Sequence, residues 1–131
     1  MFKIFRFFFF LFRYRSIVLG DVAFGDDVWI RYSYLKGNIS IGSGSTVHRS
    51  SLEGNISIGV NSSITGPFTL LHCKEKFITI GDRSAIAPGT LVITVGHDRS
   101  VRNKSLRAGG VLTEEDIKIG SDVWLGAGVR L

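Results

Sequence analysis

The feature that most constrains this chain is a six-residue period in its apolar side chains. Between Ile78 and His97, the large apolar residues Ile80, Ile86 and Val92 lie six residues apart. That period fits neither the 3.6-residue turn of an α-helix nor the two-residue alternation of an isolated strand. It does fit a parallel β-helix, in which each flat face is one short strand followed by a turn. Three hexapeptides then make one triangular coil.

The same period begins at Val18 and predicts a single all-β domain over residues 17–131. Its clearest repeat is LKGNISIG at 35–42, followed by LEGNISIG at 52–59, so one coil takes about seventeen residues. The Gly-Asn pair in each copy marks equivalent turns, because both residue types tolerate positive φ. The phase also places Leu70 in the apolar interior. About five coils are expected, begun at Phe24, Ile41, Ile58, Ile80 and Ile119.

Residues 1–16 form a separate aromatic and basic segment. They contain seven of the ten phenylalanines and four basic residues, but no acidic residue. The apolar run 7–12 is far shorter than the roughly 18 residues that span a bilayer, and no small-residue cleavage site follows it. Two roles stay open: a hydrophobic cap on the first coil, or a peripheral membrane contact through residues 1–15 on anionic head groups.

The overall charge and the cysteine content exclude some function classes. Four charges of the formal net charge of +5 belong to the first segment, so the repeat domain is nearly balanced. Such a balance provides no electrostatic footprint for DNA or RNA, and no nucleic-acid partner is predicted. Cys73 is the only cysteine and cannot form an intramolecular disulfide. We therefore expect a cytoplasmic protein, peripheral at the inner face of the membrane if the first segment is an anchor.

Two stretches interrupt the period. The first lies around His72 to Lys76, and we expect a small solvated excursion at a corner of the coil. The second, 98–116, is polar, contains Gly109-Gly110 and is predicted to be a long excursion loop of the kind that often serves as a lid or binding element. Leu131 begins a third face with no corner after it, which suggests a domain truncated at its C-terminus or an end covered by another chain.

His97 is the first candidate for chemistry. A neutral imidazole can take a proton from a hydroxyl group near neutral pH, and His97 is expected at the last corner of its coil, before the long loop. The alternative is a corner histidine that only bonds a backbone carbonyl. A zinc site formed by His48, His72 and His97 is not expected, because the three occupy different places in their coils. Cys73 would need a neighbouring base to act as a nucleophile, and His72 points to the opposite side of a strand.

The segment ITIGDRSAIAPGTLVITVGHD, followed by a variable loop and IKIGSDVWLGAGV, resembles the hexapeptide-repeat acetyltransferases. The resemblance is strongest to the maltose and galactoside acetyltransferase group and its polysaccharide O-acetyltransferase relatives, over residues 78–131. It implies a left-handed β-helix that assembles as a homotrimer, with active sites between subunits. It also implies acetyl-CoA as the co-substrate, no metal, and a sugar or glycan hydroxyl as acceptor.

The resemblance assigns roles to individual residues. His97 falls on the family's general base, and Trp124 on an aromatic residue that lines the acetyl-donor site. The turn formed by Gly126, Ala127 and Gly128 falls where backbone groups meet the pantetheine arm. The candidates for the acceptor site are less specific and are Thr69, His72, Glu75 and Asp98.

This chain also departs from the family. Thr69 stands where the galactoside type has an asparagine that holds the acceptor, and the relatives continue for two or three further coils. The sequence therefore predicts an acetyl-CoA-dependent O-acetyltransferase, with a non-catalytic β-helix assembly module or an inactive fragment as the alternative. A relative of the γ-class carbonic anhydrases is a third reading, which bound zinc would support.

Overall fold

The computed structural model of the protein describes residues 3–6, 9–11, 15–97 and 112–131, and these contain strands and turns but no helix. No helix able to cross a membrane is therefore found in the described part of the chain. Its strands are β1 (Lys3–Arg6), β2 (Phe9–Leu11), β3 (Ser16–Phe24), β4 (Trp29–Arg31), β5 (Tyr34–Ile41), β6 (Thr46–Ile58), β7 (Ser63–Ile80), β8 (Ala85–Ile86), β9 (Leu91–Ile93), β10 (Val95–His97), β11 (Leu112–Glu114), β12 (Ile117–Ile119) and β13 (Trp124–Leu125).

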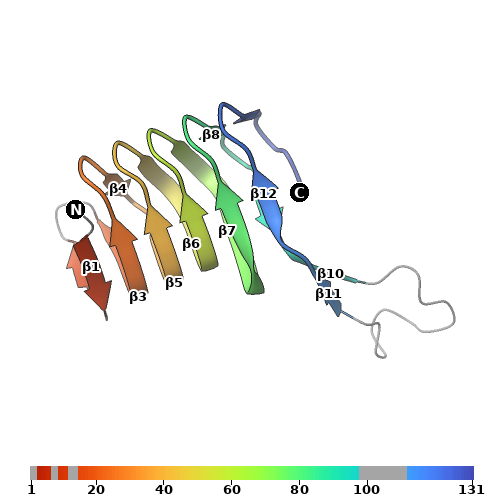
Figure 1. Cartoon of the computed structure of the whole chain (residues 1–131), viewed down its shortest axis with the longest axis horizontal. Coiled ribbons are helices and arrows are strands. Elements are labelled where there is room, and N and C mark those ends of the chain that lie inside the picture. Colours follow the sequence, from red (N-terminus) through yellow and green to blue (C-terminus); the bar gives the residue numbers. More distant parts are fainter. Residues whose placement is uncertain (1–2, 7–8, 12–14, 98–111) are drawn as a thin grey trace, which may run out of the picture.

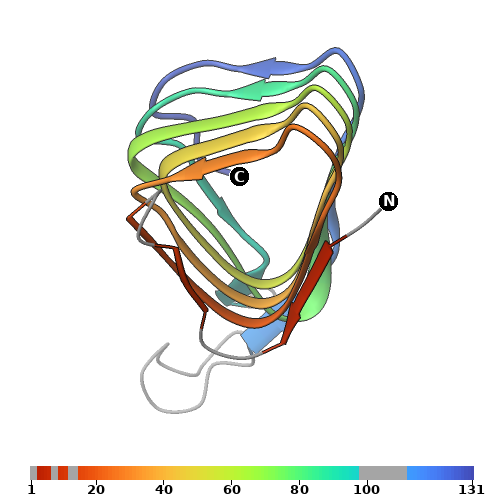
Figure 2. The same cartoon turned by 90° about the vertical axis from the view of Figure 1, so that its left-hand side faces the viewer.

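From β3 onward the strands, apart from β10 and β11, stack in parallel as a β-solenoid of about five coils, as predicted (Figure 1). The register is regular: β3 pairs with β5, and β5 pairs residue for residue with β6 over the two GNISI repeats. Seen from the N-terminal end, the chain runs anticlockwise as it recedes from the viewer (Figure 2). That is the sense of a left-handed helix.

The coils have three faces, each with an inward row of apolar side chains. Face 1 has the row Val18, Leu35, Leu52, Leu71 and Val92. Face 2 has the row Val22, Ile39, Ile56, Ile78 and Ile117. Face 3 has the row Ile30, Val47, Ile64, Ile86 and Leu125. These rows form most of one continuous hydrophobic core along the axis, which is why each coil needs its neighbours.

The corner between faces 2 and 3 contains a ladder of buried serines. Ser45, Ser62 and Ser84 occupy the same place in successive coils, and each hydroxyl accepts a hydrogen bond from a backbone N–H of the following coil. Each hydroxyl also donates to a carbonyl of the following coil, at 2.7–2.8 Å. Serine suits this place because it is small and supplies both a donor and an acceptor.

The third coil corrects one prediction from the sequence. Leu71, not Leu70, is fully buried, because β7 has two more residues than β6 at the corner between faces 3 and 1. There Ser50 pairs with Thr69, and the extra residues include the exposed Phe68. A second register shift, opposite Gly54, adds the residues around Lys74 to Lys76. Together the two insertions explain the longer spacing between Ile58 and Ile80.

The aromatic segment pairs with the first coil. β1 runs antiparallel to residues 21–24 of β3, and β2 runs antiparallel to residues 16–18. The two strands thus add to the edges of two faces of the solenoid, as the predicted capping segment would (Figure 2). Membrane contact through residues 1–15 stays a prediction.

Candidate functional site

His97 lies on a short two-stranded ribbon that leaves the fourth coil. The last residue held in the coil is Thr94, whose N–H donates to the carbonyl of His72 at 3.1 Å. Beyond it, β10 turns outward and pairs antiparallel with β11, with His97 opposite Leu112. Both side chains are exposed. The excursion therefore begins at residue 95, earlier than the predicted 98. The strand β10, which ends at His97, projects beyond the corner at which His97 was expected (Figure 1).

A carboxylate at the base of this ribbon holds it to the third coil. Glu114 accepts hydrogen bonds at 2.9 Å from the backbone N–H groups of Lys74, Glu75 and Lys76, and from the Thr94 hydroxyl. Asp116 accepts a further one from the N–H of Phe77, at 3.0 Å. The excursion at Lys74–Lys76 was expected to be solvated, and its three residues are exposed. Their backbone N–H groups are nevertheless satisfied by Glu114 of the second excursion.

The hydrogen bonds determine the ionisation of Glu114. Partial desolvation alone would raise its pKa, but the N–H groups of Lys76, Glu75 and Lys74, together with the Thr94 hydroxyl, outweigh that effect. They lower the pKa from 4.5 to about 2. Glu114 is therefore fully ionised at neutral pH, and the ribbon base at the corner between faces 1 and 2 is held by a charge.

Trp124 is on face 3, away from the ribbon. It lies on β13, pairs with Ala85 of the preceding coil, and has 77% of its surface exposed. The turn that follows contains Gly126, Ala127 and Gly128. Gly128 has a φ of 75°, which favours glycine, and its N–H donates to the carbonyl of Pro88 at 3.1 Å.

The acceptor-site candidates fall at different places. Thr69 is buried at the corner between faces 3 and 1, where its hydroxyl donates to the carbonyl of Thr65 at 2.7 Å. His72 is half-buried on face 1, with Nδ1 3.7 Å from Oε2 of Glu53. Glu75 is exposed at the ribbon base. Asp98 lies outside the described residues.

The predicted site residues therefore form two groups within one chain. His72, Glu75 and His97 gather where the ribbon leaves the corner between faces 1 and 2. Trp124 and the glycine turn lie on face 3 and the corner that follows it, and the buried Thr69 lies at that same corner. Figure 2 shows the ribbon and β13 on opposite sides of the prism. A single chain does not bring His97 and Trp124 together.

The described residues do not support a zinc site or a nucleophilic Cys73. They contain no group of three or more potential metal-binding side chains, and His48 lies on face 3, far around the coil from His72 on face 1. Cys73 is buried, and its thiol donates to the carbonyl of Asn55 at 3.2 Å. Burial raises its pKa, so the thiolate is disfavoured at neutral pH.

Face 3 also carries a hollow that was not predicted from the sequence. It has a volume of about 390 Å³ and lies over the first three coils; its lining residues are Trp29, Arg31, Thr46, Val47, His48 and Thr65. The sequence did carry a signal for it. FGDDVWI at 24–30 repeats the pattern of IGSDVWL at 119–125, so a tryptophan occupies the same place in the first and fifth coils.

No family model, curated protein or solved structure matches the chain significantly.

Proposed function

We propose that the protein is an acetyl-CoA-dependent O-acetyltransferase that acts on a sugar or glycan hydroxyl, with His97 as the general base. The observation that carries the proposal is the division of the candidate residues. His97 and Trp124 are both exposed, and the strands that carry them, β10 and β13, lie on opposite sides of one solenoid. If copies of the chain pack side by side, the ribbon of one copy can face the Trp124 surface of the next. The motif series around Ile78–His97 and Trp124–Gly128 supports the same reading by its resemblance to the hexapeptide acetyltransferases.

The proposed reaction is a direct transfer. His97 takes the proton from the acceptor hydroxyl, and the alkoxide attacks the thioester carbonyl of acetyl-CoA. A new C–O bond forms, the C–S bond breaks, and the proton on His97 passes to the departing thiolate. Trp124 and the backbone of the Gly126–Gly128 turn would hold the donor, and backbone N–H groups would stabilise the oxyanion. No covalent intermediate with the protein is needed.

The hydrogen bonds that Glu114 accepts at the ribbon base have a defined part in this scheme. General-base catalysis requires the imidazole to lie within hydrogen-bond reach of the acceptor. His97 stands only three residues from Thr94, and its strand is paired with the strand that ends at Glu114. The bonds from Glu114 to the corner at Lys74–Lys76 therefore set the direction in which the ribbon projects. Glu114 is a positioning residue in this proposal.

The test combines donor binding, transfer and subunit mixing. Calorimetry with acetyl-CoA should detect binding that Trp124→Ala weakens and His97→Asn leaves unchanged. Thiol release in the presence of a panel of sugars should fall about 10²- to 10⁴-fold with His97→Asn. Glu115→Gln changes an exposed side chain at the ribbon base that has no part in the scheme; it is the control and should change the rate less than a few-fold.

Subunit mixing tests whether the site is shared. Refolding His97→Asn together with Trp124→Ala should restore part of the activity, because some interfaces then combine an intact His97 with an intact Trp124. Absence of acetyl-CoA binding by the folded protein would instead favour a non-catalytic assembly module. Binding of acetyl-CoA without restored activity in the mixed variants would refute the shared site but not the proposed transferase function.

A further inference from the structure

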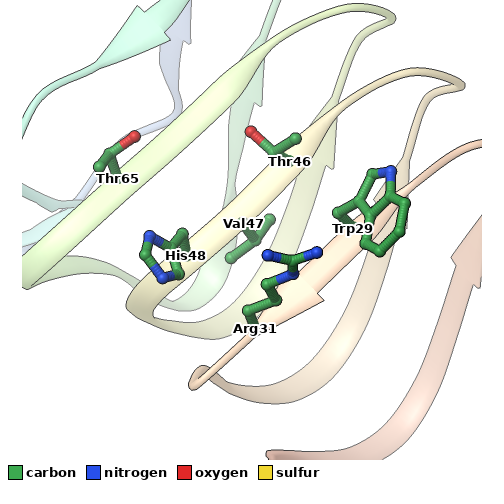
Figure 3. Close-up of a pocket in the computed structure, with 6 residues that line it drawn as sticks. All are labelled: Trp29, Arg31, Thr46, Val47, His48 and Thr65. Atoms are coloured by element: carbon green, nitrogen blue, oxygen red, sulfur yellow. The ribbon is translucent and has the colours of Figure 1, made fainter. Parts of the chain in front are cut away.

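The hollow on face 3 is lined by side chains from three successive coils. Thr46 pairs with Trp29, and His48 pairs with Arg31 on one side and with Thr65 on the other. Because alternate residues of a strand point to opposite sides, these residues share the outer surface, and the inward Val47 closes the floor between them. Figure 3 shows them around one shallow space.

The side chain of Arg31 places a positive charge in this hollow. The guanidinium carbon of Arg31 lies 4.6 Å from the centre of the Trp29 ring, a cation–π contact that restrains the long side chain. In Figure 3 the guanidinium lies between the Trp29 ring and the imidazole of His48. Among the residues that line the hollow there is no carboxylate. A restrained guanidinium with no carboxylate among the lining residues is suited to an anionic ligand.

The remaining lining residues indicate what kind of molecule carries the anion. Thr46, Thr65 and His48 provide hydroxyl and imidazole groups that can each donate or accept hydrogen bonds. Trp29, which is 40% exposed, adds an aromatic surface at one edge. The hollow is open rather than enclosed, which favours one unit of an extended ligand rich in hydroxyl groups over a small buried ion.

The surface beyond the hollow is suited to an extended chain. The outward row that starts at Trp29 continues through Thr46, Ser63 and Ala85 to Trp124. Small side chains thus separate two tryptophans on one flat face. Four steps of a parallel ladder are about 19 Å.

We propose that this hollow binds an anionic sugar unit of a glycan, with its carboxylate or phosphate on Arg31 and its hydroxyls on Thr46, His48 and Thr65. The rest of the glycan then runs along face 3 toward Trp124. The binding site stands on its own geometry. That the bound glycan is the acceptor of the transfer rests on the function proposed above.

Binding is measured on the full chain without acetyl-CoA, so that the result does not depend on catalysis. Three probes are titrated by calorimetry: a short oligogalacturonate, the neutral oligosaccharide of the same length, and a hexose phosphate. At least one anionic probe should bind with much higher affinity than the neutral one. Arg31→Gln should weaken that binding about tenfold to one-hundredfold, since it removes a charge-assisted contact. Trp29→Ala should weaken it about threefold to thirtyfold.

Matched controls separate the hollow from general surface charge. Lys36→Gln removes an exposed cation on face 1 and should leave binding unchanged, and circular dichroism checks that each variant is folded. Equal binding of charged and neutral probes, no binding of any probe, or full affinity in Arg31→Gln would overturn the proposal. Displacement of the probe by free CoA would assign the hollow to the acetyl donor and would also overturn the proposal. Anionic binding without transfer would refute only the proposed enzymatic function.

Discussion

Substitution of Ser62 by alanine tests the serine ladder, which joins the coils at the corner between faces 2 and 3. Ser62 is almost completely buried. Its hydroxyl accepts from the N–H of Ser84 at 3.0 Å and donates to the carbonyl of Gly81 at 2.8 Å. Its own N–H donates to the Ser45 hydroxyl at 2.9 Å and stays bonded in the variant. The substitution therefore removes one rung of the ladder and leaves the preceding rung intact.

The expected cost follows from the groups left without partners. A typical hydrogen bond contributes about 1 kcal/mol to stability, but a buried donor left unsatisfied costs about 1–3 kcal/mol. Alanine occupies nearly the same space as serine, so no cavity term is added. We expect Ser62→Ala to lower the free energy of unfolding by about 1–3 kcal/mol, because the buried N–H of Ser84 loses its acceptor.

Urea denaturation followed by circular dichroism measures this difference. Ser57→Ala is the matched control, because Ser57 is exposed and its hydroxyl accepts an exposed hydrogen bond from that of Ser40, at 3.2 Å. The control should change the free energy of unfolding by less than about 0.5 kcal/mol. Equal stability of the two variants would show that the ladder does not contribute as argued.

Three further predictions concern the ribbon, the cysteine and the first segment. Glu114→Gln should speed amide hydrogen exchange at residues 74–76, and Glu115→Gln should not. Because the pKa of Glu114 is lowered from 4.5 to about 2, the stability that the Glu114 carboxylate adds should be complete above pH 4.5 and lost as the pH falls through 2. Cys73, buried and with a raised pKa, should react with iodoacetamide at neutral pH only after unfolding, and rapid labelling of the folded chain would contradict its burial. If residues 1–15 bind membrane, the full chain should float with anionic liposomes and a chain starting at Ser16 should not; equal flotation of the two would exclude the anchor.

The sequence predicted most of the fold because the period has a direct geometric cause. A hexapeptide rhythm places the same kind of side chain on the same face in every coil, and the rows of Ile39, Ile56 and Ile78 follow it. The prediction failed at Leu70, where the longer corner before it changes the phase. A period can be extrapolated only through corners of constant length, and corner length depends on local turns that no repeat specifies.

The candidate site was less accessible to sequence reasoning. Glu114 contacts residues about forty positions earlier, and that contact exists only because two interruptions of the period fall at the same corner of adjacent coils. Nothing in the spacing of the acidic residues indicates it. The hollow at Arg31 had a visible signal in the repeated tryptophan pattern, but its lining combines three coils, and only the register shows which side chains meet.

The serine ladder also has a direction. Every hydroxyl in it finds both its donor and its principal acceptor in the coil that follows, never in the one before. A chain that folds as it emerges from the ribosome would therefore complete each serine only when the next coil is laid down. The equivalent places in the first and fifth coils are taken by Val28 and Val123, which have no hydroxyl to satisfy. When the coils form in this order, at most one serine hydroxyl of the ladder lacks its partners at any time, and none lacks them once the fifth coil has formed.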